Sequence, residues 1–424
     1  MSPDGLDIVT FGCRLNLAES ASMRQLASEA GLTDTVVVNT CAVTSEAERQ
    51  ARQAIRRLRR ERPSARIVVT GCAVQIDATP WAAMPEVDAV LGNAEKLNKN
   101  NYLSLENQAR PGFAVGPWKE ASTMPFLPPS DLPGHSRGFL QVQNGCDHRC
   151  TFCVIPMGRG PGRSLPAGAV VERARAMVAA GRNEIVLSGV DLTAWGADLP
   201  GQPGLGALCR RLLKLVPELP RLRLSSLDPV EIDDELLALL GEEPRLMPHL
   251  HLSVQAGADL TLKRMKRRHG RDDVLRLVEI ARQRRPDVVF GADLIAGFPT
   301  ETGAMFADTL ALVDEADLLW LHVFPYSPRA GTPAARMPQV PGPLRRERAA
   351  HLRAAGEARV DRFLRAQWGL VVSALIELDG TGHTEHFAPV RPVESLPAGA
   401  VVDLRVVGVE ERSLIATSVE RVAA

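Results

Sequence analysis

The chain has 424 residues, of which 45% are apolar, 24% charged and only 4% aromatic. This composition excludes wholesale disorder and a collagen-like repeat, and the length predicts about three domains. The 50 basic residues balance the 50 acidic ones, so a nucleic-acid site would have to be a local patch. No apolar run reaches the ~18 residues of a membrane-spanning helix. The first five residues lack the pattern of a signal peptide, so we expect a cytoplasmic protein.

Strand-like and helical segments alternate over residues 1–118. We predict strands at 6–11, 35–39 and 66–70, and helices at 16–30 and 45–62. Alternation of this kind predicts an α/β domain with a parallel sheet and covering helices. Residues 119–136 contain four prolines and no periodicity, which predicts an interdomain linker.

A strand-then-helix unit repeats over residues 137–366. The predicted strands are 139–143, 184–188, 221–225, 249–254, 288–295 and 318–324. Eight such units would close a full barrel, so six predict a partial (β/α)₆ barrel with an open side. An Arg-rich helix at 344–366 ends this domain. Short β runs at 371–378, 401–407 and 414–418 then predict a small all-β module over residues 370–424.

Three cysteines form a C-x₃-C-x₂-C loop directly after the first predicted barrel strand: Cys146, Cys150 and Cys153. Three thiolates on one short loop can hold three irons of a [4Fe–4S] cluster and leave the fourth iron open. The loop follows the carboxyl end of a strand, where barrel active sites lie. The alternative is a zinc loop, in which His148 would supply a fourth ligand.

Three more cysteines each end a predicted strand: Cys13, Cys41 and Cys72. If the strands are parallel, the three thiols emerge at one edge of the sheet, where open α/β sheets bind ligands. Helices begin just after Cys13 and Cys41, and their N-termini would favour an anionic cluster. The alternative is three separate buried thiols. Cys209 lies in a helical run at 205–215, and we expect it in the core.

The two cysteine triads together resemble the radical S-adenosylmethionine (SAM) methylthiotransferases, over nearly the whole chain. Segments 10–20, 39–44 and 158–161 look most like the subtype that modifies threonylcarbamoyladenosine 37 of tRNA, although Met157 stands where the family commonly has Tyr. The resemblance implies that the cluster of the second triad binds SAM. It also implies an auxiliary [4Fe–4S] cluster on Cys13, Cys41 and Cys72, which carries the sulfur for insertion. A second SAM molecule would methylate that sulfur.

Further positions look like SAM contacts of the family, because they lie at the ends of predicted barrel strands. They are Gly189, Asp191, Ser225, Gln255 and Asp293. The alternative is that they form barrel turns with only local hydrogen bonds. No side chain is singled out as catalytic.

Three groups of basic residues are candidate phosphate contacts. They are Arg52, Arg56, Arg57, Arg59 and Arg60; Lys263, Arg264, Lys266, Arg267 and Arg268; and Arg159 with Arg163. The alternative is a set of solvated surfaces. The C-terminal module resembles a TRAM domain, a small β-barrel that binds RNA in this family. Residues 371–424 nevertheless hold eight acidic residues against four Arg. We interpret His383 and His386 as loop residues rather than a metal pair.

The expected function is transfer of a methylthio group to C2 of threonylcarbamoyladenosine 37. The expected partners are a tRNA anticodon stem-loop, an electron donor and a sulfur donor of unknown identity, and no membrane. Two alternatives remain open at this point. One is a methylthiotransferase that acts on a ribosomal-protein aspartate, and the other is a non-catalytic iron–sulfur protein that binds RNA.

Overall fold

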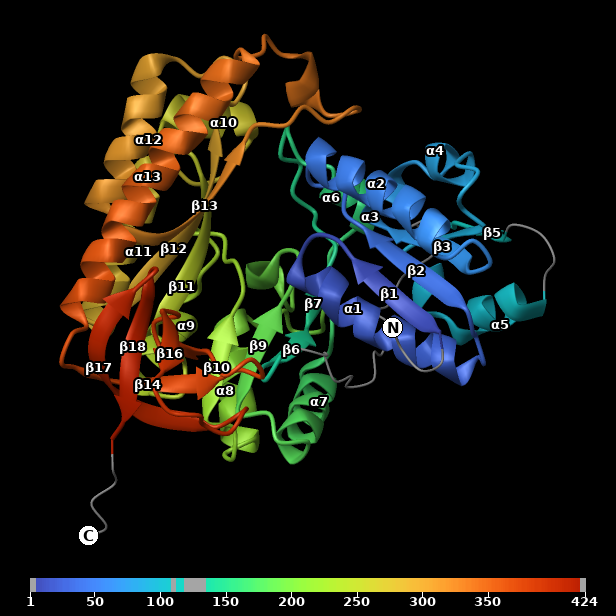
Figure 1. Cartoon of the computed structure of the whole chain (residues 1–424). Coiled ribbons are helices and arrows are strands. Elements are labelled where there is room, and N and C mark those ends of the chain that lie inside the picture. Colours follow the sequence, from blue (N-terminus) through green and yellow to red (C-terminus); the bar gives the residue numbers. More distant parts are fainter. Residues whose placement is uncertain (1–4, 108–111, 118–134, 420–424) are drawn as a thin grey trace. The chain divides into compact units, whose positions relative to one another are not determined.

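A computed structural model describes residues 5–107, 112–117 and 135–419 (Figure 1). The predicted linker at 119–136 lies outside these residues, except for its last two positions. The chain divides into two compact units. The first comprises Met1–Pro133, Gln141–Leu165 and Ser327–Ala335, and the second Gly134–Leu140, Pro166–Tyr326 and Arg336–Ala424. The domain boundaries expected near 118, 137 and 370 stay predictions. Among the described residues, no helix combines the length and the apolar character needed to cross a membrane.

The first unit is built on a five-stranded parallel sheet in the order β1-β2-β3-β4-β5. Its strands are β1 (Leu6–Thr10), β2 (Thr35–Thr40), β3 (Arg66–Gly71), β4 (Ala89–Leu91) and β5 (Gly112–Ala114). The sequence predicted the first three. The other two have three residues each, which is too short for the alternation that marks a strand.

Helices cover both faces of this sheet because its central strands are apolar on both sides (Figure 1). Val37 of β2 packs in one cluster with Met23 and Ala27, whereas Val36 and Val38 pack in another with Ile55. The first cluster belongs to α1 (Arg14–Glu29) and α5 (Lys99–Asn107). The second belongs to α2 (Ser45–Glu61), α3 (Cys72–Ile76) and α4 (Thr79–Ala82).

The second cysteine loop also belongs to the first unit. Two short antiparallel strands flank it, β7 (Gln143–Asn144) and β8 (Arg163–Ser164). Helix α6 (Ile155–Arg159) follows the loop and packs against α3. Val154 joins the apolar cluster of α2 and α3, so the loop is anchored to the N-terminal sheet layer.

Six strands form the framework of the second unit. They are β6 (Gly138–Gln141), β9 (Glu184–Ser188), β10 (Arg221–Leu224), β11 (His249–Gln255), β12 (Val289–Ala296) and β13 (Leu318–Pro325). They make two three-stranded sheets, β10-β9-β6 and β11-β12-β13. Isolated parallel bridges, Leu222 to Leu246 and Leu227 to Leu252, link the two. This arrangement confirms the predicted six-stranded partial barrel.

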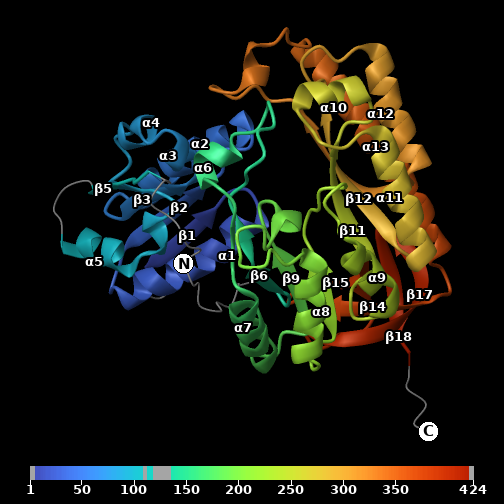
Figure 2. The ribbon, with the colours of Figure 1, turned by 180° about the vertical axis from the view of Figure 1, so that it is seen from behind.

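Seven helices connect or follow these strands: α7 (Ala167–Ala179), α8 (Leu205–Leu215), α9 (Asp234–Glu242), α10 (Asp259–Met265), α11 (Arg271–Arg284), α12 (Gly303–Glu315) and α13 (Gly342–Ala366). Figure 2 shows α12 and α13 near β12, and α13 packs on both β12 and β13. Cys209 in α8 is fully buried, so the expected core position is confirmed.

The C-terminal module is a closed five-stranded barrel in the order β14-β15-β16-β18-β17. Its strands are β14 (Val371–Ile376), β15 (Gly382–Thr384), β16 (Pro389–Pro392), β17 (Val401–Glu410) and β18 (Ser413–Ser418). Alternate residues such as Leu404 and Val406 fill its core. The small β-barrel was predicted, and the two shortest strands were missed for the same reason as β4 and β5.

Candidate functional site

The first cysteine triad lies at one edge of the N-terminal sheet. Cys13, Cys41 and Cys72 follow the carboxyl ends of β1, β2 and β3, which are adjacent and parallel. Cys41 and Cys72 are buried, and Cys13 is exposed. Burial is the main reason that the pKa of the Cys41 thiol rises to about 11, and the neighbouring Cys72 and Cys13 raise it further. The parallel sheet thus brings together three thiols that are far apart in the sequence.

Two glycines allow the thiols to approach one another. Gly12 has φ +93°, and a Cβ there would lie 2.6 Å from the Cys41 sulfur. Gly71 has φ +102°, and a Cβ there would lie 2.3 Å from the carbonyl oxygen of Thr40. Only glycine combines such a φ with so close an approach. Each glycine directly precedes a cysteine of the triad, so the backbone turns sharply where the thiols are presented.

A buried ionic network lies against this triad. Glu19 of α1 accepts hydrogen bonds from Arg159 at 2.5 Å and from Lys96 at 2.7 Å, and all three side chains are essentially inaccessible to water. Burial alone would raise the pKa of Glu19, but Arg159 and Lys96 together lower it to about 2. Arg159 also donates from Nε to the Cys72 sulfur at 3.2 Å.

This network fits an anionic group held by the triad. Two buried positive charges, Arg159 and Lys96, face one buried negative charge, Glu19, so one positive charge is left over beside Cys72. An isolated buried charge is costly unless it is paired. Three thiolates that hold an iron–sulfur cluster would supply the compensating negative charge.

Arg159 and Arg163 are therefore not surface phosphate contacts, and that expectation is wrong. Arg159 is 1% exposed and Arg163 is 4% exposed. Arg163 donates a hydrogen bond to the carbonyl oxygen of Arg159 at 3.1 Å. The sequence placed both beside glycines after the cysteine loop, where a solvent-exposed turn is common. Glu19, the acid that pairs with the buried Arg159, is 140 residues away in the sequence, on α1.

The second triad sits on the loop between β7 and α6, and all three thiols are partly exposed. The Cys146 amide donates to the carbonyl oxygen of Gly160 at 3.1 Å, and the Ile155 amide donates to the Cys153 sulfur at 3.4 Å. Gly145 has φ +76°, and a Cβ there would lie 1.8 Å from the Pro161 carbonyl oxygen. The loop is thus folded back onto the segment that follows it.

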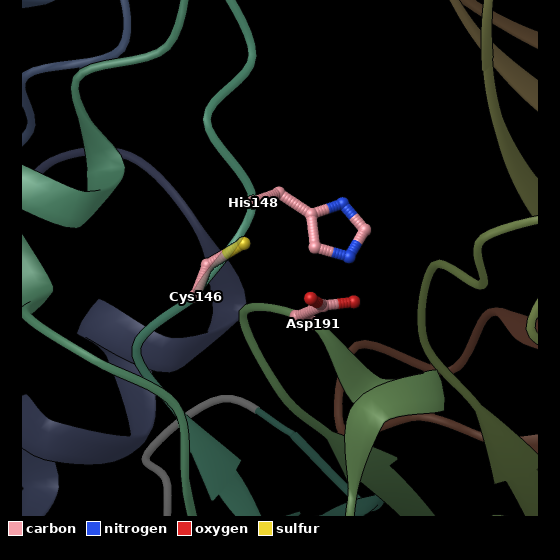
Figure 3. A group of neighbouring side chains, drawn as sticks. All are labelled: Cys146, His148 and Asp191. Carbon is pink, nitrogen blue, oxygen red and sulfur yellow. The ribbon is translucent and has the colours of Figure 1, made fainter. Parts of the chain in front are cut away.

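Figure 3 shows Cys146 and His148 on this one loop, and Asp191 on the turn after β9. The Cys146 sulfur and a ring nitrogen of His148 lie within 4.8 Å of each other. His148 is therefore near the triad, as the zinc alternative requires. The choice between zinc and iron then depends on the family to which the chain belongs.

The predicted SAM contacts lie on four consecutive strands of the second unit. Gly189 and Asp191 follow β9, Ser225 follows β10, and Gln255 is the last residue of β11. The Ser225 Oγ is buried and has no hydrogen-bond partner among the described residues. This hydroxyl is therefore able to form a hydrogen bond with a bound ligand. Gln255 has φ +69°, a left-handed backbone conformation that is uncommon outside glycine.

Asp293 differs from the other four, because it lies in the interior of β12 rather than at or after the end of a strand. Its Oδ1 is 3.1 Å from Nε2 of His251 on β11 and 3.3 Å from Nδ1 of His322 on β13. Burial would raise the pKa of Asp293, but the two histidines hold it well below its usual range. The sequence reasoning missed both histidines. Their signal was a histidine in each of the two predicted strands that flank the strand of Asp293 in the chain.

The other basic groups are largely paired with acids. Arg59 lies 2.5 Å from Asp88, and Arg52 stacks over the ring of Trp81. Arg267 lies 2.8 Å from Asp228, and Arg268 pairs with Glu231. Lys263 and Lys266 are exposed on and just after α10. These two lysines are the members of their cluster best placed to meet a phosphate in solution.

The C-terminal barrel shows the same pairing. Arg391 lies 2.9 Å from Glu411, and Arg412 lies 2.8 Å from Glu357. His383 stacks on Phe387, and His386 lies 3.2 Å from Asp287. His383 lies inside strand β15, so the expected loop position is wrong for this residue, whereas His386 lies in the turn that follows β15. Arg421 lies outside the described residues.

Comparisons with known proteins identify the family. Residues 140–313 match the Radical SAM superfamily, and residues 6–92 match a family described as uncharacterized protein family UPF0004. The chain is 49% identical over 405 residues to the threonylcarbamoyladenosine tRNA methylthiotransferase MtaB of Rickettsia prowazekii (strain Madrid E). That match covers 96% of this chain and 95% of the relative.

Two further relatives agree on the reaction but differ in the named substrate. The MtaB of Bacillus subtilis (strain 168) is 34% identical, over 77% of this chain and 74% of the relative. The tRNA-2-methylthio-N(6)-dimethylallyladenosine synthase of Erythrobacter litoralis (strain HTCC2594) is 36% identical, over 89% and 88%.

Among solved structures, the radical S-adenosylmethionine methyltransferase TsrM of Kitasatospora setae, with cobalamin and a [4Fe-4S] cluster bound, has a TM-score of 0.55. It is 15% identical, and the match covers 78% of this chain and 73% of that chain. The likeness shows a shared fold. The alternatives of a structural zinc loop and of a non-catalytic RNA-binding protein do not agree with these relatives. The chain therefore belongs to the radical SAM methylthiotransferases, enzymes that work with S-adenosylmethionine and a [4Fe–4S] cluster.

Proposed function

We propose that this enzyme transfers a methylthio group to C2 of N6-threonylcarbamoyladenosine 37 in the anticodon stem-loop of a cytoplasmic tRNA. The similarity to the Rickettsia prowazekii relative, at 49% identity over nearly the whole chain, carries the substrate assignment. Segments 10–20 and 39–44, which look most like the threonylcarbamoyladenosine subtype, surround two cysteines of the first triad.

The proposal gives each triad one [4Fe–4S] cluster. Cys146, Cys150 and Cys153 would hold the cluster that binds and cleaves SAM, and Cys13, Cys41 and Cys72 would hold an auxiliary cluster for the transferred sulfur. Three ligands per cluster leave one iron open to react. The single surplus positive charge buried beside Cys72 supports the second assignment.

The chain's own residues bind and orient the reactants in this proposal. Gly189, Asp191, Ser225 and Gln255 would line the SAM site, where the unpartnered Ser225 hydroxyl can take a hydrogen bond from the ligand. His251 and His322 keep Asp293 ionised and fixed in position as an acceptor. Lys263 and Lys266 are the first residues to test for phosphate contact.

The substrate assignment is tested by mass spectrometry of tRNA nucleosides from a strain that lacks the gene. We expect the methylthio form of threonylcarbamoyladenosine to disappear and the unmodified nucleoside to accumulate. Loss of the methylthio dimethylallyl nucleoside instead would assign the substrate of the Erythrobacter relative. Unchanged tRNA with an unmodified ribosomal-protein aspartate would assign the third reaction of the family.

The two-cluster assignment is tested by a variant in which Cys13, Cys41 and Cys72 are all replaced by Ala. Wild-type enzyme purified without oxygen should contain about eight irons per chain, and the variant about four. The variant should still release 5′-deoxyadenosine from SAM under reducing conditions, but it should not insert sulfur. A wild-type content of about four irons would contradict the second cluster.

A further inference from the structure

The Arg159 guanidinium connects the two cysteine triads within the first unit. Its Nε donates to the Cys72 sulfur at 3.2 Å. Its two terminal nitrogens donate to Glu19 at 2.5 and 3.0 Å, to Asn16 at 2.6 Å and to Asn144 at 3.3 Å. A guanidinium has five N–H donors, so these five hydrogen bonds use all of them.

The backbone of Arg159 lies next to one triad, and its side chain contacts the other. Its backbone lies in α6, just after the loop of Cys146, Cys150 and Cys153. Its side chain reaches the thiol of Cys72, which belongs to the other triad. Asn144 Oδ1, which accepts from Arg159, also accepts from the amide of Gly145, directly before Cys146. A continuous path of hydrogen bonds therefore runs from Cys72 to the start of the second loop.

We propose that Arg159 is a positioning residue that sets the reduction potential of the auxiliary cluster. This inference rests on the proposed function, because it requires a cluster on Cys13, Cys41 and Cys72. A hydrogen bond to a ligating sulfur and a nearby positive charge both stabilise the more negative, reduced cluster, and so raise its potential. Arg159 supplies both effects at one sulfur.

The network gives Arg159 little freedom to move. Glu19 holds it with two hydrogen bonds, and Lys96 holds Glu19 from the other side. Asn39 in turn accepts from Lys96 at 3.3 Å and donates to the backbone of Asn16 at 3.0 Å. The guanidinium is thus fixed before any cluster binds, which makes its effect on the sulfur reproducible.

A second donor to the same sulfur provides an independent comparison. Asn93 Nδ2 lies 3.7 Å from the Cys72 sulfur and also donates to the carbonyl oxygen of Gly158 at 2.7 Å. It is neutral and more distant than Arg159. Its contribution to the potential should have the same sign and a smaller size.

The test is a redox titration of the two-cluster enzyme, followed by electron paramagnetic resonance. The signal of the auxiliary cluster is assigned as the one that the Cys13, Cys41 and Cys72 triple variant lacks. In Arg159→Met we expect that signal to shift to a more negative midpoint potential. At a fixed potential the ratio of reduced to oxidised auxiliary cluster should fall at least tenfold, which is about 59 mV for a one-electron couple.

Two more variants keep the test decisive if Arg159→Met loses its iron. Arg159→Lys keeps the charge but has three N–H donors in place of the five that Arg159 uses, so a smaller negative shift is expected. Asn93→Leu should give a smaller negative shift than Arg159→Met. Arg348→Met removes a buried arginine from α13 of the second unit, where it pairs with Glu301, and should leave the auxiliary potential unchanged.

The inference is overturned if the variants that retain about eight irons keep the wild-type auxiliary potential. It is also overturned if both clusters shift equally, because a general change in the protein would then be responsible. A wild-type enzyme with only about four irons is a different result. It would refute the auxiliary cluster itself, and with it the proposed function.

Discussion

At the scale of single residues, the main feature is the amount of charge sealed inside the first unit. Glu19, Lys96 and Arg159 are each at most 1% exposed. A buried ion pair contributes little net stability, because desolvation offsets the attraction between the charges. Removal of one partner, however, leaves an uncompensated charge and is strongly destabilising. The network is therefore better explained by the proposed auxiliary cluster on the first triad than by a need for stability.

We predict that Glu19→Gln lowers the free energy of unfolding by about 3–5 kcal/mol at neutral pH, since two buried cations lose their counter-charge. The folded pKa of Glu19 is about 2, below its usual value of 4.5. Its stabilising effect is therefore present above pH 4.5 and is lost as the pH falls toward 2. Urea unfolding at a series of pH values measures the difference from wild type.

The matched control is Glu279→Gln, which changes an exposed glutamate on α11. It should change the free energy of unfolding by less than ~0.5 kcal/mol, as surface substitutions usually do. The prediction would be contradicted if both substitutions lowered the free energy of unfolding equally. It would also be contradicted if the difference between Glu19→Gln and wild type stayed the same as the pH falls toward 2.

At the scale of elements, the parallel sheet and its glycines bring the first triad together. Adjacent strands of one direction deliver their carboxyl ends to one edge. Gly71 is then needed for the sharp turn into α3, which begins at Cys72. A side chain at this position would push against the Thr40 backbone, next to Cys41.

We predict that Gly71→Ala displaces Cys72 and Cys41 and reduces the iron content from about eight to about four per chain. Gly181→Ala is the control, because Gly181 has φ +84° but open space around its Cβ position. The Gly181→Ala enzyme should lose some stability, because alanine is strained at this φ, but it has no steric clash and should retain about eight irons. Iron analysis with a thermal melt measures both effects. A Gly71→Ala enzyme that retains eight irons would show that the edge tolerates a side chain.

At the scale of the whole molecule, ionic contacts attach the C-terminal barrel to the strands of the second unit. Buried Glu184 on β9 lies 3.0 Å from Arg223 and 3.4 Å from Arg221, both on β10. The two arginines also donate to carbonyl oxygens of the barrel: Arg223 to Thr384 and Glu385, and Arg221 to Ser373. The backbone of the barrel thus supplies part of its attachment, beside charge pairs of its own such as Arg412 with Glu357 of α13.

We predict that Arg223→Met loosens the C-terminal barrel, because it breaks a buried network and leaves Glu184 and two carbonyl oxygens with fewer partners. Hydrogen exchange followed by mass spectrometry should show faster exchange in β14–β16, with β1–β3 unchanged. Arg391→Met, which removes an exposed arginine paired with Glu411, is the control. Equal exchange in the two variants would mean that other contacts hold the barrel.

The sequence by itself determined the order of the elements, the partial barrel, the small β-barrel and the two cysteine triads. These follow from local periodicity and from short spacings, which a linear pattern records directly. The three-residue strands β4 and β5 were not predicted, because a segment so short shows no periodicity in its sequence. Cys13, Cys41 and Cys72 could be grouped only because each ends a recognisable strand.

Only the tertiary structure decided which charges meet. Arg159 looked like a surface phosphate contact, yet it is buried between Glu19, 140 residues away, and Cys72, 87 residues away. His251 and His322 likewise reach Asp293 from neighbouring strands. No local pattern specifies such pairs, because the partner of a buried charge is set by which segments the fold places side by side. The burial that decides its role depends on the same packing.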